Sequence, residues 1–348
     1  MKKVLLILIA SLLLTSCGQS KVEIENNIVV KEIEKKEEKI KVTSSIIPIS
    51  SIINKIWWEY VEVNNIVPAW VSPHGFDLSV KQRQEIEDSK IVFLVWLEHI
   101  DWFLEKAVNE EKKVNLSKWI SLLKATEHED HDDHSEDEHH DEHEEKNHLH
   151  EHDEHWHEDD EHHEEHDEDE EHEDEHWHQY DPHIWLWKEN IAIISETINK
   201  KLTELLPEQE DFFNKNKEEL IKQVDELYLQ FLNKTDWKTS TKFIVFHDAY
   251  NYLMESIWMD LENKVVFSEN VLHESGTAHI AELIKEVEQK WIKNIFKEPQ
   301  FSDWLVEKFS LEYNLEIWSL DPIWVDFSKD WYLKNIESNI NNISKVYE

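Results

Sequence analysis

Two series of short apolar segments, alternating with helical patterns, restrict the fold more than any other feature of this sequence. The first series predicts strands at residues 40–46, 61–67, 91–95 and 113–116. Helical patterns between them cover residues 79–89 and 100–109. The second series predicts strands at residues 242–246, 264–268, 294–297 and 315–320. Strands that alternate with helices form parallel sheets, so the sequence predicts an α/β protein.

A single long amphipathic stretch between the two series predicts one long helix. It covers residues 207–233, which would extend about 40 Å, and its apolar residues lie on one helical stripe. Two α/β series joined in this way predict two Rossmann-like lobes, each with a parallel four-stranded sheet. We assign residues 41–187 to the first lobe, 188–234 to the joining helices and 235–348 to the second lobe. Ligands of open α/β sheets bind outside the carboxyl ends of the strands, which here places a site in the cleft between the lobes.

Residues 127–178 interrupt the first lobe with almost no apolar side chains. They carry 29 acidic residues, one lysine and 17 of the 23 histidines, so 28 of the 41 net negative charges lie there. Such a composition cannot form a core and predicts a disordered loop. The remainder is mildly acidic, and no basic patch indicates nucleic-acid binding.

The amino-terminal residues have the pattern of a bacterial lipoprotein signal. Two lysines precede an apolar run at residues 4–14, which is too short for a permanent membrane span. The sequence LTSC then ends at Cys17, the only cysteine, which rules out an internal disulfide. We predict a signal peptide at residues 1–16, a lipid anchor on Cys17 and a tether at residues 17–40. The mature chain would be extracytoplasmic, held at the membrane and monomeric.

Three histidines and one aspartate stand where a cleft site should lie. His74 follows Ser-Pro, His183 follows Asp-Pro, His247 directly follows an apolar strand, and Asp321 follows the last strand. Three imidazoles and a carboxylate suit a borderline divalent ion such as Zn²⁺. Three other histidines outside the acidic loop are expected to be surface or supporting groups: His99, His273 and His279.

These residues stand in motifs that resemble the metal-binding, substrate-binding lipoproteins of ABC importers, specifically the zinc-type group. The motifs are VPAWVSPH at residues 67–74, DPHIWL at 181–186, FHDAY at 246–250, IFKEPQFS at 295–302 and LDPI at 320–323. The resemblance implies a receptor that delivers Zn²⁺ to an ABC permease and is not an enzyme. It implies His74, His183 and His247 as ligands and Asp321 as the least certain fourth ligand, a place that water or another carboxylate can take. Glu298 is expected to be structural.

Three alternatives remain open at this point. A manganese or iron receptor of the same family would favour more carboxylate ligands. A zinc hydrolase would need a general base beside an open zinc position, and no HExxH motif is present outside the acidic loop. A zinc buffer or cell adhesin would act through the acidic loop, where we expect auxiliary low-affinity binding by the clustered His139, His140, His148, His150, His152, His162 and His163.

The balance of glycine and tryptophan is unusual. The chain has 3 glycines and 17 tryptophans, whereas an average chain of this length has roughly 24 glycines. Many tryptophans occupy places that favour a turn, such as Trp70 between two prolines. We hypothesise that UGA codons for glycine were read as tryptophan at Trp70 and at Trp57, Trp58, Trp96, Trp119, Trp258, Trp291, Trp318, Trp324 and Trp331. Trp185 is expected to be genuine, and Trp102 and Trp304 could be either.

Overall fold

Two parallel four-stranded sheets form the framework of the protein. The computed structural model describes residues 38–97, 100–125, 180–233, 241–268 and 276–347. The first sheet has the strand order β2-β1-β3-β4. Its strands are β1 (Ile40–Ser44), β2 (Val61–Asn65), β3 (Ile91–Leu94) and β4 (Lys113–Asn115). The second sheet has the order β6-β5-β7-β8, with β5 (Phe243–Val245), β6 (Lys264–Val266), β7 (Asn294–Lys297) and β8 (Glu316–Ser319).

All eight predicted strands are confirmed, and all their pairings are parallel. Several strands end one or two residues earlier than the apolar pattern suggested. Strand β1, for example, ends at Ser44, the chain bends at Ser45 and Ile46, and α1 begins at Ile47. Apolar residues just beyond a strand end are still buried, and some of them still donate across the sheet, as Ile66 does to the Ser44 carbonyl at 3.0 Å. The apolar pattern therefore extends past the regular part of each strand. The bounds of the two predicted lobes remain predictions.

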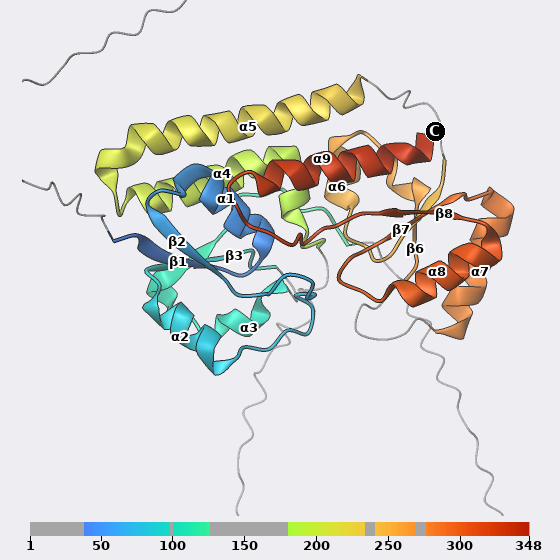
Figure 1. Cartoon of the computed structure of the whole chain (residues 1–348), viewed down its shortest axis with the longest axis horizontal. Coiled ribbons are helices and arrows are strands. Elements are labelled where there is room, and N and C mark those ends of the chain that lie inside the picture. The colour runs from blue at the N-terminus through green and yellow to red at the C-terminus, as the bar shows by residue number, and fades with distance from the viewer. Residues whose placement is uncertain (1–37, 98–99, 126–179, 234–240, 269–275, 348) are drawn as a thin grey trace, which may run out of the picture. The chain divides into compact units, whose positions relative to one another are not determined.

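Helices connect the strands and cover the sheets (Figure 1). The first half contains α1 (Ile47–Trp57), α2 (Val80–Asp88), α3 (Trp102–Glu105) and the 3-10 helix η2 (Glu110–Lys112). The middle of the chain contains η4 (Ile184–Leu186), α4 (Lys188–Thr203), η5 (Pro207–Gln209) and α5 (Glu210–Leu232). The second half contains α6 (Asn251–Ser256), η6 (Leu261–Asn263), α7 (Thr277–Lys290), α8 (Asp303–Tyr313), α9 (Trp331–Ile343) and η7 (Ser344–Tyr347). In the described part of the chain, none of these helices has the length and apolar content that a membrane span requires.

Two of the predicted helices illustrate what local sequence can decide. Helix α2 begins where expected, because the Ser79 hydroxyl accepts from the Gln82 amide while the Gln82 side chain accepts from the Ser79 amide. The helix predicted over residues 100–109 is wrong in its extent, since only Trp102–Glu105 are helical. Here the buried carboxylate of Asp101 instead accepts hydrogen bonds from the amides of Val95 and Trp96. That interaction ties the loop after β3 to the start of α3.

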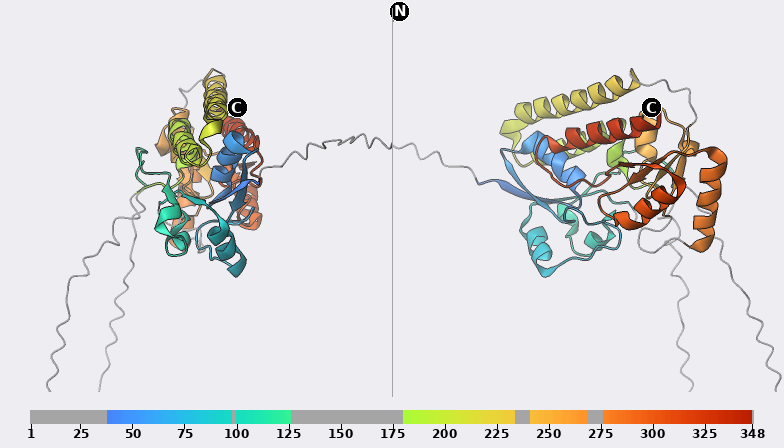
Figure 2. Two further views of the ribbon diagram at one scale, coloured as in Figure 1. Left: turned by 90° about the vertical axis from the view of Figure 1, so that its left-hand side faces the viewer. Right: turned by 45° about the vertical axis from the view of Figure 1, so that its right-hand side comes forward.

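Two long helices lie side by side along one edge of both sheets. The long helix α5 packs on α1, α4 and α9, and its buried residues include Phe213, Leu220 and Val224. Helix α9 contacts α1 in the first half and β8 in the second. Figures 1 and 2 show α5 and α9 running in the same general direction above the sheets. The predicted joining helix is therefore present, and α9 reinforces it.

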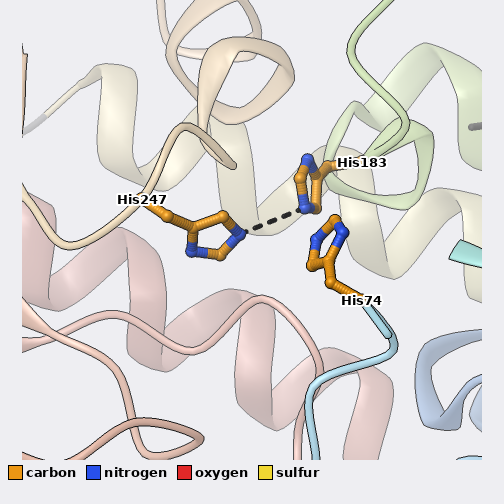
Figure 3. A group of neighbouring side chains, drawn as sticks. All are labelled: His74, His183 and His247. Carbon is orange, nitrogen blue, oxygen red and sulfur yellow. Dashed lines mark hydrogen bonds between the residues drawn. The ribbon is translucent and has the colours of Figure 1, made fainter. Parts of the chain in front are cut away.

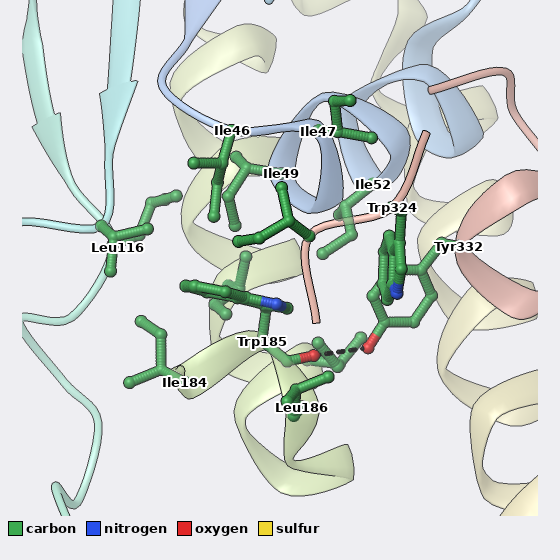
Figure 4. Packing of buried hydrophobic residues seen from close by; sticks show 14 of the residues in the cluster. Ile46, Ile47, Ile49, Ile52, Leu116, Ile184, Trp185, Leu186, Trp324 and Tyr332 are labelled. Carbon is green, nitrogen blue, oxygen red and sulfur yellow. Dashed lines mark hydrogen bonds between the residues drawn. The ribbon is translucent and has the colours of Figure 1, made fainter. Parts of the chain in front are cut away.

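The core around the amino end of α4 is built on a fully buried tryptophan. Trp185 packs among the isoleucines of α1, and its indole N–H donates to the carbonyl of Pro322 over 2.6 Å. Its own carbonyl accepts from the Tyr332 hydroxyl over 2.9 Å (Figure 4). The indole N–H and the carbonyl of Trp185 are thus both used, which ties the His183 segment to the carboxyl-terminal segment.

Candidate metal centre

The fold brings His247 and Glu298 together at the point where the second sheet reverses its strand order. Strands β5 and β7 are neighbours, and Val245 pairs with Phe296. Two residues further along each strand direction come His247 and Glu298. In open α/β sheets this reversal point is where ligand sites form. The carboxylate of Glu298, 1% exposed, accepts from the His247 Nδ1 at 2.8 Å.

A second buried carboxylate orients His183 in the same way. The Oδ1 atom of Asp181 accepts from the His183 backbone amide at 2.9 Å and from its Nδ1 at 2.7 Å. Pro182 lies between them and restricts the backbone of Asp181 to extended conformations. Because a carboxylate can only accept, Nδ1 carries the proton and Nε2 presents a lone pair. This is the arrangement that zinc-binding histidines commonly have.

The Nε2 atoms of His183 and His247 approach to 3.4 Å (Figure 3). Both Nδ1 atoms are committed to carboxylates, so both Nε2 atoms are acceptors and cannot bond to each other. A cation between them removes the repulsion between their lone pairs. Zn–N bonds of 2.0–2.1 Å in a tetrahedron separate two ligand nitrogens by about 3.3 Å. The observed distance therefore fits two ligands of one zinc ion.

His74 completes the group from the first half of the protein. It lies in the turn after β2, where the Phe76 amide donates to the Pro73 carbonyl at 3.2 Å and Gly75 has a φ of 73°. That positive φ requires a residue without a side chain, or strain. Ligand atoms of His74, His183 and His247 all lie within 4.8 Å of one another. Figure 3 shows the three imidazoles converging from three separate segments.

Burial favours the neutral form of the His183 imidazole. The pKa of His183 is lowered from its usual value, chiefly because burial disfavours the charged ring, and Asp181 opposes this only in part. A neutral imidazole is the form that binds metal. The site is thus prepared to accept a cation without first releasing a proton from this residue.

Asp321 does not join the three histidines. Its Oδ1 accepts from the Gln300 side chain at 2.7 Å and from the backbone amides of Trp324 and Ile323 at 2.8 Å and 3.2 Å. Among the described residues, the group that could hold one ion contains only the three imidazoles. The pocket beside them is lined by Glu298, Gln300 and Phe301, and not by Asp321.

The other histidines singled out by sequence fall into two groups. His279 lies on α7, where its Nε2 is 3.1 Å from the Phe267 carbonyl and away from the three imidazoles. Several predicted sites lie outside the described residues: Cys17, His99, His273 and the whole acidic loop. The loop includes the seven clustered histidines His139, His140, His148, His150, His152, His162 and His163. Their predicted roles stay predictions.

From the sequence alone, Asp181 had no predicted role and Glu298 was expected to be structural. For Asp181, the signal was a carboxylate two residues before a candidate ligand, across a proline. For Glu298, the signal was its place after β7, which the βαβ order places beside β5. Both carboxylates orient a predicted ligand.

The sequence matches the family described as "Zinc-uptake complex component A periplasmic" over residues 42–346. The chain belongs to this family. It is a family of zinc-uptake components that work outside the cytoplasm, not a family of enzymes.

Individual relatives agree with this assignment. The chain is 31% identical over 314 residues to the "High-affinity zinc uptake system protein ZnuA" of Haemophilus influenzae, covering 86% of this chain and 91% of that one. It is 25% identical to the "Zinc-binding protein AdcA" of Streptococcus pyogenes over 82% of this chain but only 51% of the relative, so it spans about half of that protein. A crystal structure of ZnuA superimposes with a TM-score of 0.67 at 20% identity, covering 89% of this chain and 100% of that one. This last similarity supports the fold alone.

Proposed function

We propose that this protein is an extracytoplasmic, lipid-anchored receptor that binds Zn²⁺ and delivers it to the permease of an ABC importer. The observation that carries the proposal is the pair of carboxylate-oriented imidazoles, with Nε2 atoms 3.4 Å apart, beside His74. Membership of a zinc-uptake family supports the same reading. The lipid anchor rests on the LTSC sequence that ends at Cys17.

The donor set favours zinc over manganese or iron. Three neutral imidazoles suit a borderline ion, whereas Mn²⁺ prefers more oxygen ligands. Glu298 and Asp181 are each engaged with an imidazole Nδ1, and Asp321 is engaged by Gln300. Among the described residues, the group whose ligand atoms lie within 4.8 Å of one another consists of the three imidazoles and includes no carboxylate.

Deleting the acidic loop should leave one tight zinc equivalent. The deletion of residues 127–178 removes 17 histidines but none of the three converging imidazoles. The loop is predicted to be disordered, and a disordered chain must lose backbone entropy to close around each ion, so its sites should be weaker than the preformed one. Calorimetric titration of the intact and loop-deleted proteins with Zn²⁺ measures this. If the tight equivalent disappeared with the loop, the buffer or adhesin reading would replace the receptor.

Removing the charge from either orienting carboxylate should weaken zinc binding by about 10- to 100-fold. In Asp181→Asn and Glu298→Gln the side-chain amide can donate to Nδ1 and move the imidazole proton to Nε2, which blocks the metal. Zinc affinity by chelator competition is the measurement. Asp211→Asn, a change in the first turn of α5, is the control and should have no effect. Wild-type affinity in both site variants would show that the carboxylates only stabilise the fold.

A further inference from the structure

The side chain of Gln300 lies between the three imidazoles and Asp321. Gln300 lines the pocket beside the histidines, and its Nε2 donates to the Asp321 Oδ1 at 2.7 Å. The orientation of the amide is fixed by chemistry, because a carboxylate can only accept. The other amide atom, Oε1, is buried and has no hydrogen-bond partner among the described residues.

The Asp321 carboxylate is held from several directions. In addition to Gln300, the amides of Ile323 and Trp324 donate to the same Oδ1 atom. The side chain of Asn339 fixes the Asp321 backbone, accepting from its amide at 2.9 Å and donating to its carbonyl at 2.8 Å. A carboxylate with three donors on one oxygen must give up bonds to turn towards a metal.

We infer that Gln300 is a positioning residue that holds Asp321 off the metal and leaves the fourth coordination place to a water molecule. This inference rests on the proposed zinc function. The unpartnered Gln300 Oε1 is available to accept from a metal-bound water. Three nitrogens and one water make a tetrahedral site, which Zn²⁺ tolerates well and Mn²⁺ does not. Gln300 would thus contribute to the choice of zinc.

The test compares Asp321→Asn, Gln300→Met and the double variant. Asparagine keeps an oxygen that can accept from Gln300 and the two amides, so the fold is retained. Methionine keeps the length of Gln300 but removes its donor. We expect Asp321→Asn to change zinc affinity by less than about tenfold and to leave the zinc X-ray absorption spectrum unchanged. In Gln300→Met the released Asp321 should add a carboxylate oxygen to the spectrum and raise manganese affinity relative to zinc by about tenfold or more. The double variant should show neither the added oxygen ligand in the spectrum nor the raised manganese affinity.

Two outcomes would overturn the inference. If Asp321→Asn weakened zinc as strongly as loss of an imidazole, Asp321 would be a ligand. If Gln300→Met left the spectrum and the manganese-to-zinc ratio unchanged, Gln300 would have no positioning role. Either result leaves one tight zinc equivalent in the wild type, whereas failure of the proposed function would remove that equivalent, so the two failures are distinguishable.

A second, independent observation concerns backbone conformation. Six non-glycine residues in the described part of the chain have positive φ, and five of them are tryptophans: Trp70, Trp96, Trp258, Trp291 and Trp324. Bulky residues rarely adopt this conformation, whereas glycine does so readily. The sixth is Asn314, the residue type that most often replaces glycine there.

The hydrogen bonds around these tryptophans are those of glycine motifs. After α6, the Met259 amide donates to the Met254 carbonyl and the Trp258 amide to the Glu255 carbonyl, which makes Trp258 the left-handed residue of a Schellman motif. Trp291 ends α7 in the same conformation. Trp70 is the third residue of a turn closed by the Val71 amide and the Pro68 carbonyl, and a positive φ there is typical of a type II turn with glycine.

The geometry points to glycine at these five positions in the natural protein, encoded by UGA codons that the organism reads as glycine. Exposure agrees, since Trp258 and Trp291 are 75% and 82% exposed and gain little from packing. Trp324 is buried, but its indole N–H has no partner among the described residues, in contrast to Trp185. Five other suspected positions, Trp57, Trp58, Trp119, Trp318 and Trp331, have no positive φ, so the backbone does not favour glycine there.

Mass spectrometry of peptides from the protein isolated from its own organism tests this. We expect glycine masses at residues 70, 96, 258, 291 and 324, and a tryptophan mass at residue 185. The codons of the gene give a second readout, with UGA at the five positions and UGG at residue 185. Tryptophan masses, or UGG codons, at the five positions would overturn the inference.

Discussion

Replacing His183 by alanine should weaken the tight zinc site by more than about 100-fold, because even the loss of an outer partner of a zinc ligand costs 10- to 100-fold. His183 is 2% exposed and lies 3.4 Å from the His247 Nε2. Without it the ion keeps two imidazoles, and the Asp181 carboxylate loses its partner. His74→Ala and His247→Ala should weaken the site to a similar degree, since each also removes one of three nitrogens.

The measurement is zinc competition against a chelator of known affinity, with the loop-deleted protein so that weak sites do not interfere. His279→Ala is the matched control. His279 lies on α7, where its Nε2 contacts the Phe267 carbonyl, and it is not part of the three-imidazole group. Circular dichroism confirms that each variant is folded. Equal affinities for all four variants would show that the tight ion binds elsewhere.

Replacing the three most exposed positive-φ tryptophans by glycine should stabilise the metal-free protein by about 3 kcal/mol in total. A left-handed conformation costs an L-residue about 1–2 kcal/mol, and glycine gives back part of this through its larger unfolded-state entropy. The changes are Trp70→Gly, Trp258→Gly and Trp291→Gly, in which 59%, 75% and 82% exposed side chains are removed. The three sites lie in separate turns, so their effects should add.

Urea denaturation of the single and triple variants gives the free energies of unfolding. The control is Trp304→Gly, because Trp304 is 66% exposed but lies within helix α8, where its φ is not positive. Glycine in a helix lowers stability by about 0.5–1 kcal/mol. The prediction fails if all four substitutions change stability in the same direction, because the positive φ of the three tryptophans would then not explain the change.

Several features of this protein follow from local sequence. The eight strands and the long helix appear in the sequence because apolar spacing reports which faces are buried, and burial follows the period of the element. Ser79 and Gln82 mark the start of α2, since a capping box needs only four consecutive residues. His74, His183 and His247 could be selected because each stands in a strand-end or proline turn within a recognisable motif. Trp70 could be suspected because a turn between prolines favours glycine.

The tertiary structure alone decided which groups share one site and what each does there. Asp321 and Glu298 are both carboxylates that follow a strand of the second sheet, and the sequence could not show which of them contacts a histidine. Their roles depend on neighbours distant in sequence: Glu298 lies beside His247 because β5 and β7 are adjacent, whereas Asp321 is bonded to Gln300. Hydrogen bonding is directional and acts over about 3 Å. Spacing along the chain does not show which side chains from distant segments come within this distance, because the fold decides that.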